Sequence, residues 1–322
     1  MAAGQTAGPF GLVSFDVPRR LDSQTALSGR WQSRKLAVRA SSRTCKPEAN
    51  MMKTVDVVVI SLPNATERRR HVTAMFDTSG ISWRFFDAHD SLQQAGLQYD
   101  ADEVKRRFGR ALSGPEIAIC SSHVAVLDQY LKLGSSDYLL VLEDDVIYDT
   151  NFPIEKFSTV CAEKRMDYVR LFGKHYVEGV RLGYFYDRHI VRFKTSPTGA
   201  QAYLMSKSGA RSFIDSFRSI DQPVDLALDS FWRTRLPIYS IFPFPIIERF
   251  SRSQNLIPPY PDRLDPYDRL IRFYNRVRNK AKKTWANLEL AATDRQMRRE
   301  GAAFRQIFDD SSARVRNSQI DC

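Results

Sequence analysis

The sequence predicts an α/β fold with a mostly parallel sheet. The first sign is VDVVVISL, residues 55–62, a continuous β-branched run that is typical of a strand buried on both faces. A helical segment and a second strand follow it directly, and this order predicts a right-handed βαβ unit with parallel strands. A third apolar run ends in acidic residues, which suits an open α/β sheet because its ligands bind beyond the carboxyl ends of the strands.

The other elements are predicted in chain order. ATERRRHVTAMFDTSG predicts a helix that Thr66 caps and Gly80 ends, with an apolar stripe between them. ISWRFFDAHD predicts a short strand, and the proline-rich stretch 237–261 predicts the end of the compact domain. The remaining predictions are helices at 114–133, 208–217 and 224–232, and strands at 138–142, 167–173 and 202–206.

The chain of 322 residues has the composition of a soluble globular protein, with a net charge of +11. For residues 1–52 we expect either a disordered leader or a natural start at Met51 or Met52, in preference to a transit peptide. We expect a catalytic domain at 53–260 and a basic, mostly helical extension at 261–322. The sequence has neither an apolar run of membrane-span length nor the pattern of a secretory signal, which favours the cytoplasm.

The most informative stretch is YLLVLEDDVIYD, in which Glu143, Asp144 and Asp145 interrupt an apolar run that resumes at Val146. Two unit charges about 5 Å apart repel by roughly 3 kcal/mol at an effective dielectric of about 20, so a cation should compensate them. In an extended segment, Glu143 and Asp145 point to the same side and can bind one Mn²⁺ or Mg²⁺, whereas Asp144 faces the scaffold or a sugar. The alternative is a solvated surface turn, which the flanking apolar residues disfavour.

Six blocks of sequence carry a family resemblance. VVVISLPNATERRRHV, FFDAHD, LSGPEIAICSSHVAVL, YLLVLEDDVIYD, GAQAYLMSKSGARSFI and PVDLALD occur in this order. Together they resemble the family 25 glycosyltransferases, which include lipopolysaccharide and lipooligosaccharide galactosyltransferases and collagen galactosyltransferase domains. The resemblance covers residues 55–254. It implies a GT-A fold, a Rossmann-like domain that binds a nucleotide sugar, usually UDP-galactose, with a divalent metal held at the acidic triplet.

The resemblance also implies residues that bind the nucleotide sugar. Asn64 stands where the base would lie, and Arg68 either contacts phosphate or pairs with a helix neighbour. Asp87 and Asp90 match positions of nucleoside contacts, although a helix cap or turn explains them equally well. Gly199 stands where the backbone could approach the ligand closely, and packing is its alternative explanation.

Three residues are expected in catalysis. Asp225 fills the family's P-V-D position and is expected to be the general base of an inverting transfer, taking the proton of the acceptor hydroxyl. Asp229, four residues later, is interpreted as a helix-face charge. Glu116 and His123 match a second family block, although a lone helical histidine is more often a structural group.

A basic amphipathic segment follows the proline-rich stretch. Residues 249–283 hold ten Lys or Arg against three Asp, interleaved with apolar residues, which is typical of contact with an anionic membrane surface. The alternative is a solvated helix that packs on its own domain through Ile271, Tyr274 and Trp285.

We therefore expect a metal-dependent, inverting glycosyltransferase that moves galactose from UDP-galactose onto a cell-envelope glycolipid. Such an enzyme would be cytoplasmic and peripheral on the inner face of the cytoplasmic membrane. One alternative is a collagen-type transferase with a protein acceptor. The other is a basic nucleic-acid-binding protein, for which no recognised motif is present.

Overall fold

The computed structural model describes residues 53–77, 79–249 and 265–318, with side chains through residue 301. The predicted leader at 1–52 and the part of the proline-rich stretch beyond residue 249 lie outside the described residues. Among the described helices, none combines the length and the apolar character needed to cross a bilayer.

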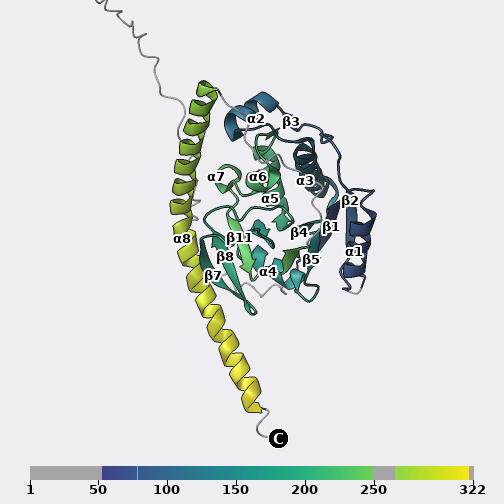
Figure 1. Ribbon diagram of the computed structural model, residues 1–322. Coiled ribbons are helices and arrows are strands. Elements are labelled where there is room, and N and C mark those ends of the chain that lie inside the picture. Colours follow the sequence, from purple (N-terminus) through teal and green to yellow (C-terminus); the bar gives the residue numbers. More distant parts are fainter. Residues whose placement is uncertain (1–52, 78, 250–264, 319–322) are drawn as a thin grey trace, which may run out of the picture. The chain divides into compact units, whose positions relative to one another are not determined.

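Within this part of the chain, eight strands form one sheet in the order β2-β1-β4-β9-β6-β11-β8-β7 (Figure 1). The strands are β1 (Val55–Ser61), β2 (Trp83–Asp87), β4 (Tyr138–Glu143), β6 (Tyr168–Arg170), β7 (Gly179–Phe185), β8 (Arg188–Phe193), β9 (Ala202–Ser206) and β11 (Ile238–Phe242). Two small two-stranded sheets pair β3 (Gln98–Tyr99) with β10 (Ser219–Ile220), and β5 (Val146–Tyr148) with β12 (Ile246–Glu248).

The predicted βαβ unit is confirmed, because β1 runs parallel to β2 on one side and to β4 on the other. The prediction of a mostly parallel sheet is wrong, since the sheet is mixed. Strand β9 lies between β4 and β6 and runs antiparallel to both, and β8 runs antiparallel to β7 and β11. Only β6 and β11 add a further parallel pair to this sheet in the described residues.

Both faces of the sheet are covered, which explains the unbroken apolar run of β1. Val58 and Ile60 point into one hydrophobic cluster, and Val57 and Val59 point into the other. Helices α2 (Ala101–Phe108), α3 (Gly114–Leu133), α5 (Lys207–Ser216), α6 (Val224–Leu228) and α7 (Phe231–Thr234) contribute to the first cluster, and α1 (Thr66–Phe76) and α4 (Ile154–Glu163) contribute to the second.

Several local predictions need correction. Thr66 is the first residue of α1 and does not cap it, because the N-cap is Ala65 and no side chain caps this end. The single helix expected at 224–232 is split into α6 and α7, with Asp229 and Ser230 between them. The proline-rich stretch holds β11, which pairs with β6 and β8 inside the sheet.

Helix α8 (Pro266–Ser318) packs beside β7 and α2 (Figure 1). Its anchor is Arg192 on β8, a fully buried side chain that bonds Asp294 through two nitrogens at 2.8 and 2.7 Å. A third nitrogen of Arg192 donates to Asn287 Oδ1 at 2.8 Å. A bidentate pair of this kind is strong and directional, so it fixes which side of α8 faces the sheet.

Candidate active site

A pocket of about 310 Å³ lies at the carboxyl ends of β1, β2 and β4, beside the first half of α3. This is where open α/β sheets bind ligands, and the volume is in the range of small-molecule sites. Among the residues predicted from sequence, the pocket brings together Arg68, Asp90, His123, Glu143, Asp144 and Asp145. Its lining does not include Asn64, Asp87, Glu116, Gly199 or Asp225.

The acidic triplet lies at a turn and not in an extended segment. Glu143 ends β4, and Asp144 and Asp145 form the turn that leads into β5. Asp144 is buried: its Oδ2 accepts a 2.6 Å hydrogen bond from Ser61, and its Oδ1 lies 2.8 Å from Arg68 Nη1. Burial raises the pKa of Asp144, while Ser61 and Arg68 act in the opposite direction. Asp144 therefore ties the turn to β1 and α1.

Asp145 has a carboxylate oxygen to which no group of the described chain donates a hydrogen bond. Its Oδ1 is buried and has no hydrogen-bond partner in the described part of the chain. Burial, followed by the charges of Glu143, Asp144 and Glu248, raises its pKa to about 7. A bound cation would offset both the cost of burying the charged carboxylate and its repulsion by the neighbouring acids, because an opposite charge nearby favours the ionised form.

The residues present fit a divalent metal with few protein ligands. No group of three or more His, Cys, Asp or Glu side chains is arranged to hold a metal ion within the described ranges. Mg²⁺ and similar ions are commonly held by one or two carboxylates while phosphates of the substrate complete the shell. Glu143 and Asp145 could supply that pair from the floor of the pocket.

His123 is held beside Glu143 by a buried tyrosine. The imidazole is 1% exposed, its Nδ1 lies 3.0 Å from Tyr203 Oη, and its Nε2 lies 3.5 Å from Glu143 Oε1. Nε2 forms no hydrogen bond within the described chain. The ring thus lines the pocket beside Glu143 without a hydrogen bond to its carboxylate.

His89, which was not among the predicted site residues, also lines the pocket. Its Nδ1 lies 2.7 Å from Ser121 Oγ, which also accepts the backbone N–H groups of Gln93 and Gln94. Because those two bonds use the acceptor capacity of the hydroxyl, its hydrogen goes to Nδ1 and the proton of the neutral ring lies on Nε2. Burial lowers the pKa of His89, which favours the neutral ring. The available signal was its place in the block FFDAHD.

Arg68 and its neighbour Arg69 bond different carboxylates. Arg68 pairs with Asp144 and lines the pocket, so it can also meet an anionic ligand there. Arg69 bonds Asp87 at the end of β2 and the carbonyl oxygen of Ser61, which ties α1 to the sheet. Asn64, between β1 and α1, is exposed.

Glu116 caps helix α3. Ser113 and Glu116 form a capping box, with the Glu116 carboxylate accepting the Ser113 N–H at 2.9 Å. Arg110 donates to the same carboxylate at 2.8 and 2.6 Å. Burial alone would raise the pKa of Glu116, but these hydrogen bonds and the Arg110 charge outweigh it, and the pKa is lowered. The contacts of Glu116 are those of a scaffold residue that fixes the start of α3.

Asp225 and Gly199 form a second cluster with each other. Gly199 N donates to Asp225 Oδ2 at 3.0 Å, and the N–H of Leu226 donates to Oδ1 at 2.8 Å. Gly199 has φ +79°, and a Cβ there would lie 2.4 Å from Gln201 Oε1 and 2.9 Å from Phe172. Packing and backbone conformation thus explain why this position is glycine.

The interpretation of Asp229 as a helix-face charge is wrong, because its side chain is buried. Tyr168 donates to it at 2.9 Å and Ser196 at 2.6 Å, and Arg170 Nη1 lies 3.6 Å away. Arg170 also donates to the carbonyl oxygen of Gly199. A buried ion pair therefore supports the loop that presents Gly199 to Asp225.

With this geometry described, the chain can be compared with known proteins. Residues 54–228 match the model of glycosyltransferase family 25 (LPS biosynthesis protein). The chain belongs to glycosyltransferase family 25. The family resemblance seen in the sequence is therefore confirmed, and the protein is an enzyme that transfers a glycosyl group.

Curated relatives share 22–30% identity with this family 25 glycosyltransferase. It is 29% identical over 202 residues to the lacto-N-neotetraose biosynthesis glycosyltransferase LgtE of Neisseria gonorrhoeae, covering 58% of this chain and 71% of the relative. It is 30% identical over 204 residues to LgtB of Neisseria meningitidis serogroup B, covering 58% and 72%. It is 22% identical to the lipooligosaccharide biosynthesis protein lex-1 of Haemophilus influenzae, covering 63% and 80%.

Among solved structures, the similar chains are more distant. A glycosyltransferase involved in glycosylation of the major capsid of PBCV-1 shares 14% identity at a TM-score of 0.28, covering 49% of this chain and 61% of that chain. A197 from STIV shares 9% identity at a TM-score of 0.34, covering 64% and 99%. At these scores neither likeness adds to the description of the fold.

Proposed function

We propose that this family 25 enzyme transfers galactose from UDP-galactose to a sugar of a cell-envelope glycolipid, with Mn²⁺ or Mg²⁺ bound at the acidic triplet of a GT-A-like domain. The names of the relatives support the acceptor class, since they concern lacto-N-neotetraose and lipooligosaccharide biosynthesis. The observation that carries the proposal is Asp145 Oδ1, a buried carboxylate oxygen that has no hydrogen-bond partner in the described residues and belongs to a pocket that Glu143 and Arg68 also line.

In this proposal the pocket binds the diphosphate of the donor. A divalent ion, when bound, would neutralise the charge that develops on the departing UDP. Glu143 and Asp145 would hold that ion, and Arg68 would bind a phosphate oxygen from the other side. Asp144, already bonded to Ser61 and Arg68, would keep the turn in place.

The nucleoside would lie along the rim of the pocket formed after β2. Asp90 and His89 both line that rim. Asp90 accepts hydrogen bonds from Gln93 at 2.7 Å and from Ser91 at 2.9 Å, which hold its carboxylate in place. A fixed carboxylate suits the ribose hydroxyls, and the neutral ring of His89 offers an N–H donor to the base.

For the chemical step we propose Asp225, which lies outside the pocket lining in the cluster with Gly199, as the general base of an inverting transfer to an acceptor that would bind beside the pocket. The carboxylate is half-buried, and two backbone N–H groups fix its orientation. It would take the proton from the acceptor hydroxyl as that oxygen attacks the anomeric carbon and the bond to UDP breaks. Arg170 and Asp229 would support this group through the Gly199 loop.

A screen of nucleotide sugars tests the proposal. We expect UDP-galactose with Mn²⁺ to release UDP faster than UDP-glucose, GDP-mannose or CMP-sialic acid, and faster still with a galactose-accepting oligosaccharide. An α or β assignment of the product by NMR tests inversion. Release of another nucleotide would overturn the donor assignment, and transfer to collagen-type peptides in preference to glycans would overturn the acceptor class.

A further inference from the structure

Helix α8 has two different faces along residues 267–297. The side toward the domain carries Ala286, Asp294 and Met297, all buried, together with the partly buried Lys283 and Leu290. The other side carries large apolar residues of which 51–69% is exposed: Tyr267, Leu270, Phe273, Tyr274, Val277, Trp285 and Leu288. The alternative in which the helix packs on its domain through Tyr274 and Trp285 is therefore wrong for these two residues.

The exposed residues form one continuous stripe. Each residue advances about 100° around an α-helix, and at that spacing Leu270, Val277 and Leu288 lie about opposite Ala286 and Met297. The bond between Arg192 and Asp294 prevents α8 from turning this stripe toward the sheet. Within the part of the chain that the structure describes, nothing covers the stripe.

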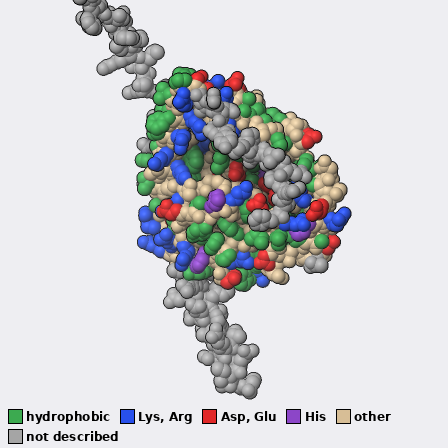
Figure 2. All heavy atoms as spheres, in the orientation of Figure 1, with side chains coloured by type: hydrophobic (Ala, Val, Ile, Leu, Met, Phe, Trp, Pro, Cys, Tyr) green, Lys and Arg blue, Asp and Glu red, His purple; other side chains and the backbone are tan. Residues whose placement is uncertain are grey.

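Basic side chains flank the stripe on both sides. At the same helical spacing, Arg269, Arg276 and Lys280 lie along one flank, and Arg278 and Lys282 lie along the other. All five are exposed. Residues 266–283 contain seven Lys or Arg and one acid, Asp268. Figure 2 shows basic and hydrophobic side chains gathered along the left edge of the molecule, over α8.

We propose that this face of α8, residues 267–288, docks flat on the surface of an anionic lipid bilayer. An apolar centre rich in Tyr, Phe, Trp and Leu, with basic residues on its flanks, places rings and aliphatic groups at the acyl boundary and cations at the lipid phosphates. A second copy of the face would bring like charges together. A nucleic-acid backbone would match the cations but would leave the apolar stripe without a partner.

Vesicle binding of the full-length chain tests this surface. We expect cosedimentation with vesicles of phosphatidylglycerol and phosphatidylcholine to be at least about tenfold stronger than with phosphatidylcholine alone. Trp285 fluorescence should shift to the blue on binding. In Trp285→Phe this blue shift should disappear while most of the binding remains.

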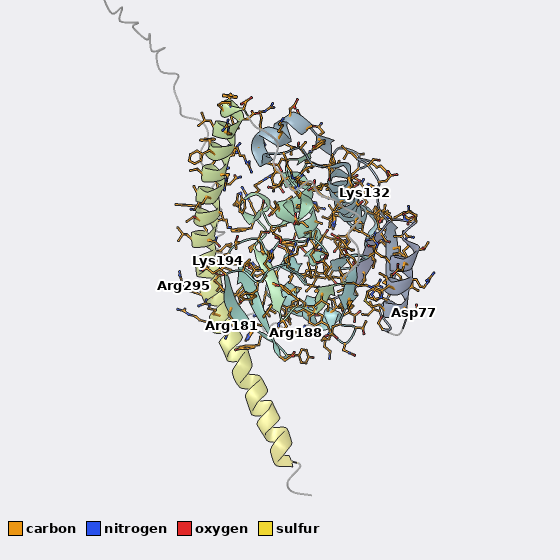
Figure 3. All side chains as sticks on the ribbon, in the orientation of Figure 1. Asp77, Lys132, Arg181, Arg188, Lys194 and Arg295 are labelled. Carbon is orange, nitrogen blue, oxygen red and sulfur yellow. The ribbon has the colours of Figure 1, made fainter. Side chains whose placement is uncertain are left out.

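Variants of α8, each compared with a control, test whether residues 267–288 bind the vesicles. Leu270→Glu with Val277→Glu should reduce vesicle binding about tenfold or more, because both charges enter the apolar stripe. Lys132→Glu is the control for charge, since Lys132 is exposed on α3, far from α8 (Figure 3). Leu133→Glu, on α3, is the control for an exposed apolar residue.

Several results would overturn the proposal. These are equal binding to neutral and anionic vesicles, no binding, an equal loss in a control variant, or binding of DNA or self-association through the stripe in place of lipid. The proposal goes beyond the donor chemistry and does not depend on it. UDP release with a soluble acceptor should be unchanged in Leu270→Glu with Val277→Glu, so failure of the two proposals is distinguishable.

Discussion

Asp144 Oδ1 lies 2.8 Å from Arg68 Nη1, and this pair joins the acidic turn after β4 to helix α1. The buried member of the triplet is thus compensated by a cation of the chain itself. Glu143 and Asp145 have no comparable ion pair to a Lys or Arg in the described residues. All three acids line the pocket, and this division explains how they are tolerated at the end of a buried strand: Asp144 is compensated by Arg68, whereas Glu143 and Asp145 remain for a ligand.

Replacing Arg68 should weaken both the fold and the pocket. Arg68→Ala leaves Asp144 buried without its cation, which should cost about 3 kcal/mol of unfolding free energy, the lower end for buried pairs because the Arg68 side chain is 22% exposed. Urea unfolding measures the loss. Arg70→Ala, an exposed position on the same helix, should cost under about 0.5 kcal/mol. Equal losses in the two variants would contradict the role of the pair.

The capping carboxylate of α3 should give a pH-dependent stability. Because the folded-state pKa of Glu116 lies below its ordinary value of 4.5, its stabilisation is complete above that value and is lost as the pH falls through the folded pKa. Glu116→Gln should cost about 1–3 kcal/mol at pH 7, and the difference from wild type should shrink toward about pH 3.

Urea unfolding at several pH values checks this prediction. Glu103→Gln, which breaks the exposed pair of Glu103 with Arg107, is the control and should change little at any pH. A loss in Glu116→Gln that stays the same from pH 7 to about pH 3 would show that the carboxylate charge does not matter.

Two glycines with the same φ angle allow the cost of backbone strain to be measured separately from the cost of overpacking. Gly199 and Gly96 both have φ +79°, but an added Cβ meets Gln201 and Phe172 at Gly199 and meets no atom within 4 Å at Gly96. Gly96→Ala should cost about 1 kcal/mol for the left-handed backbone alone. Gly199→Ala should cost about 1–3 kcal/mol more, because it overpacks the loop that bonds Asp225. Thermal unfolding compares them, and equal losses would contradict the tight packing.

The bonds between Arg192 and Asp294 should hold α8 on the sheet. Asp294→Ala removes both bonds to the buried Arg192 and should cost about 3–5 kcal/mol. Limited proteolysis should then cut α8 faster. Glu300→Ala, at an exposed position of the same helix, is the control. If Asp294→Ala leaves both stability and cleavage unchanged, the Arg192 bonds do not hold the helix.

The sequence predicted the parts of the fold that depend on local patterns. Strand β1 could be recognised because it is a β-branched run, and helix α3 lies at the predicted residues 114–133. Strand direction could not be recognised, because residues 202–206 form the same apolar run in either direction. The structure shows that the chain first forms β7 and β8 at the far edge of the sheet. It then places β9 beside β4, antiparallel to it.

The pocket was predictable for a similar reason. Carboxylates that interrupt a buried run are unusual, so Glu143 and Asp145 could be singled out from sequence. His89 was marked only by its place in the block FFDAHD, because its role depends on Ser121, which is distant in sequence. For the basic segment the sequence left two alternatives, contact with a membrane surface or packing on the domain through Ile271, Tyr274 and Trp285. The bond of the buried Asp294 to Arg192 decides which face of α8 meets the domain.

The central claim is that the acidic triplet binds UDP through a divalent ion. Titration calorimetry of UDP with and without Mn²⁺ tests it most directly, on wild type, Asp145→Asn and the exposed control Asp215→Asn. We predict that Mn²⁺ tightens UDP binding to wild type and to Asp215→Asn by about tenfold or more, and that Asp145→Asn loses this gain while its unfolding temperature does not fall. UDP binding that is independent of Mn²⁺ in wild type, or an Mn²⁺ gain that persists in Asp145→Asn, would contradict the account.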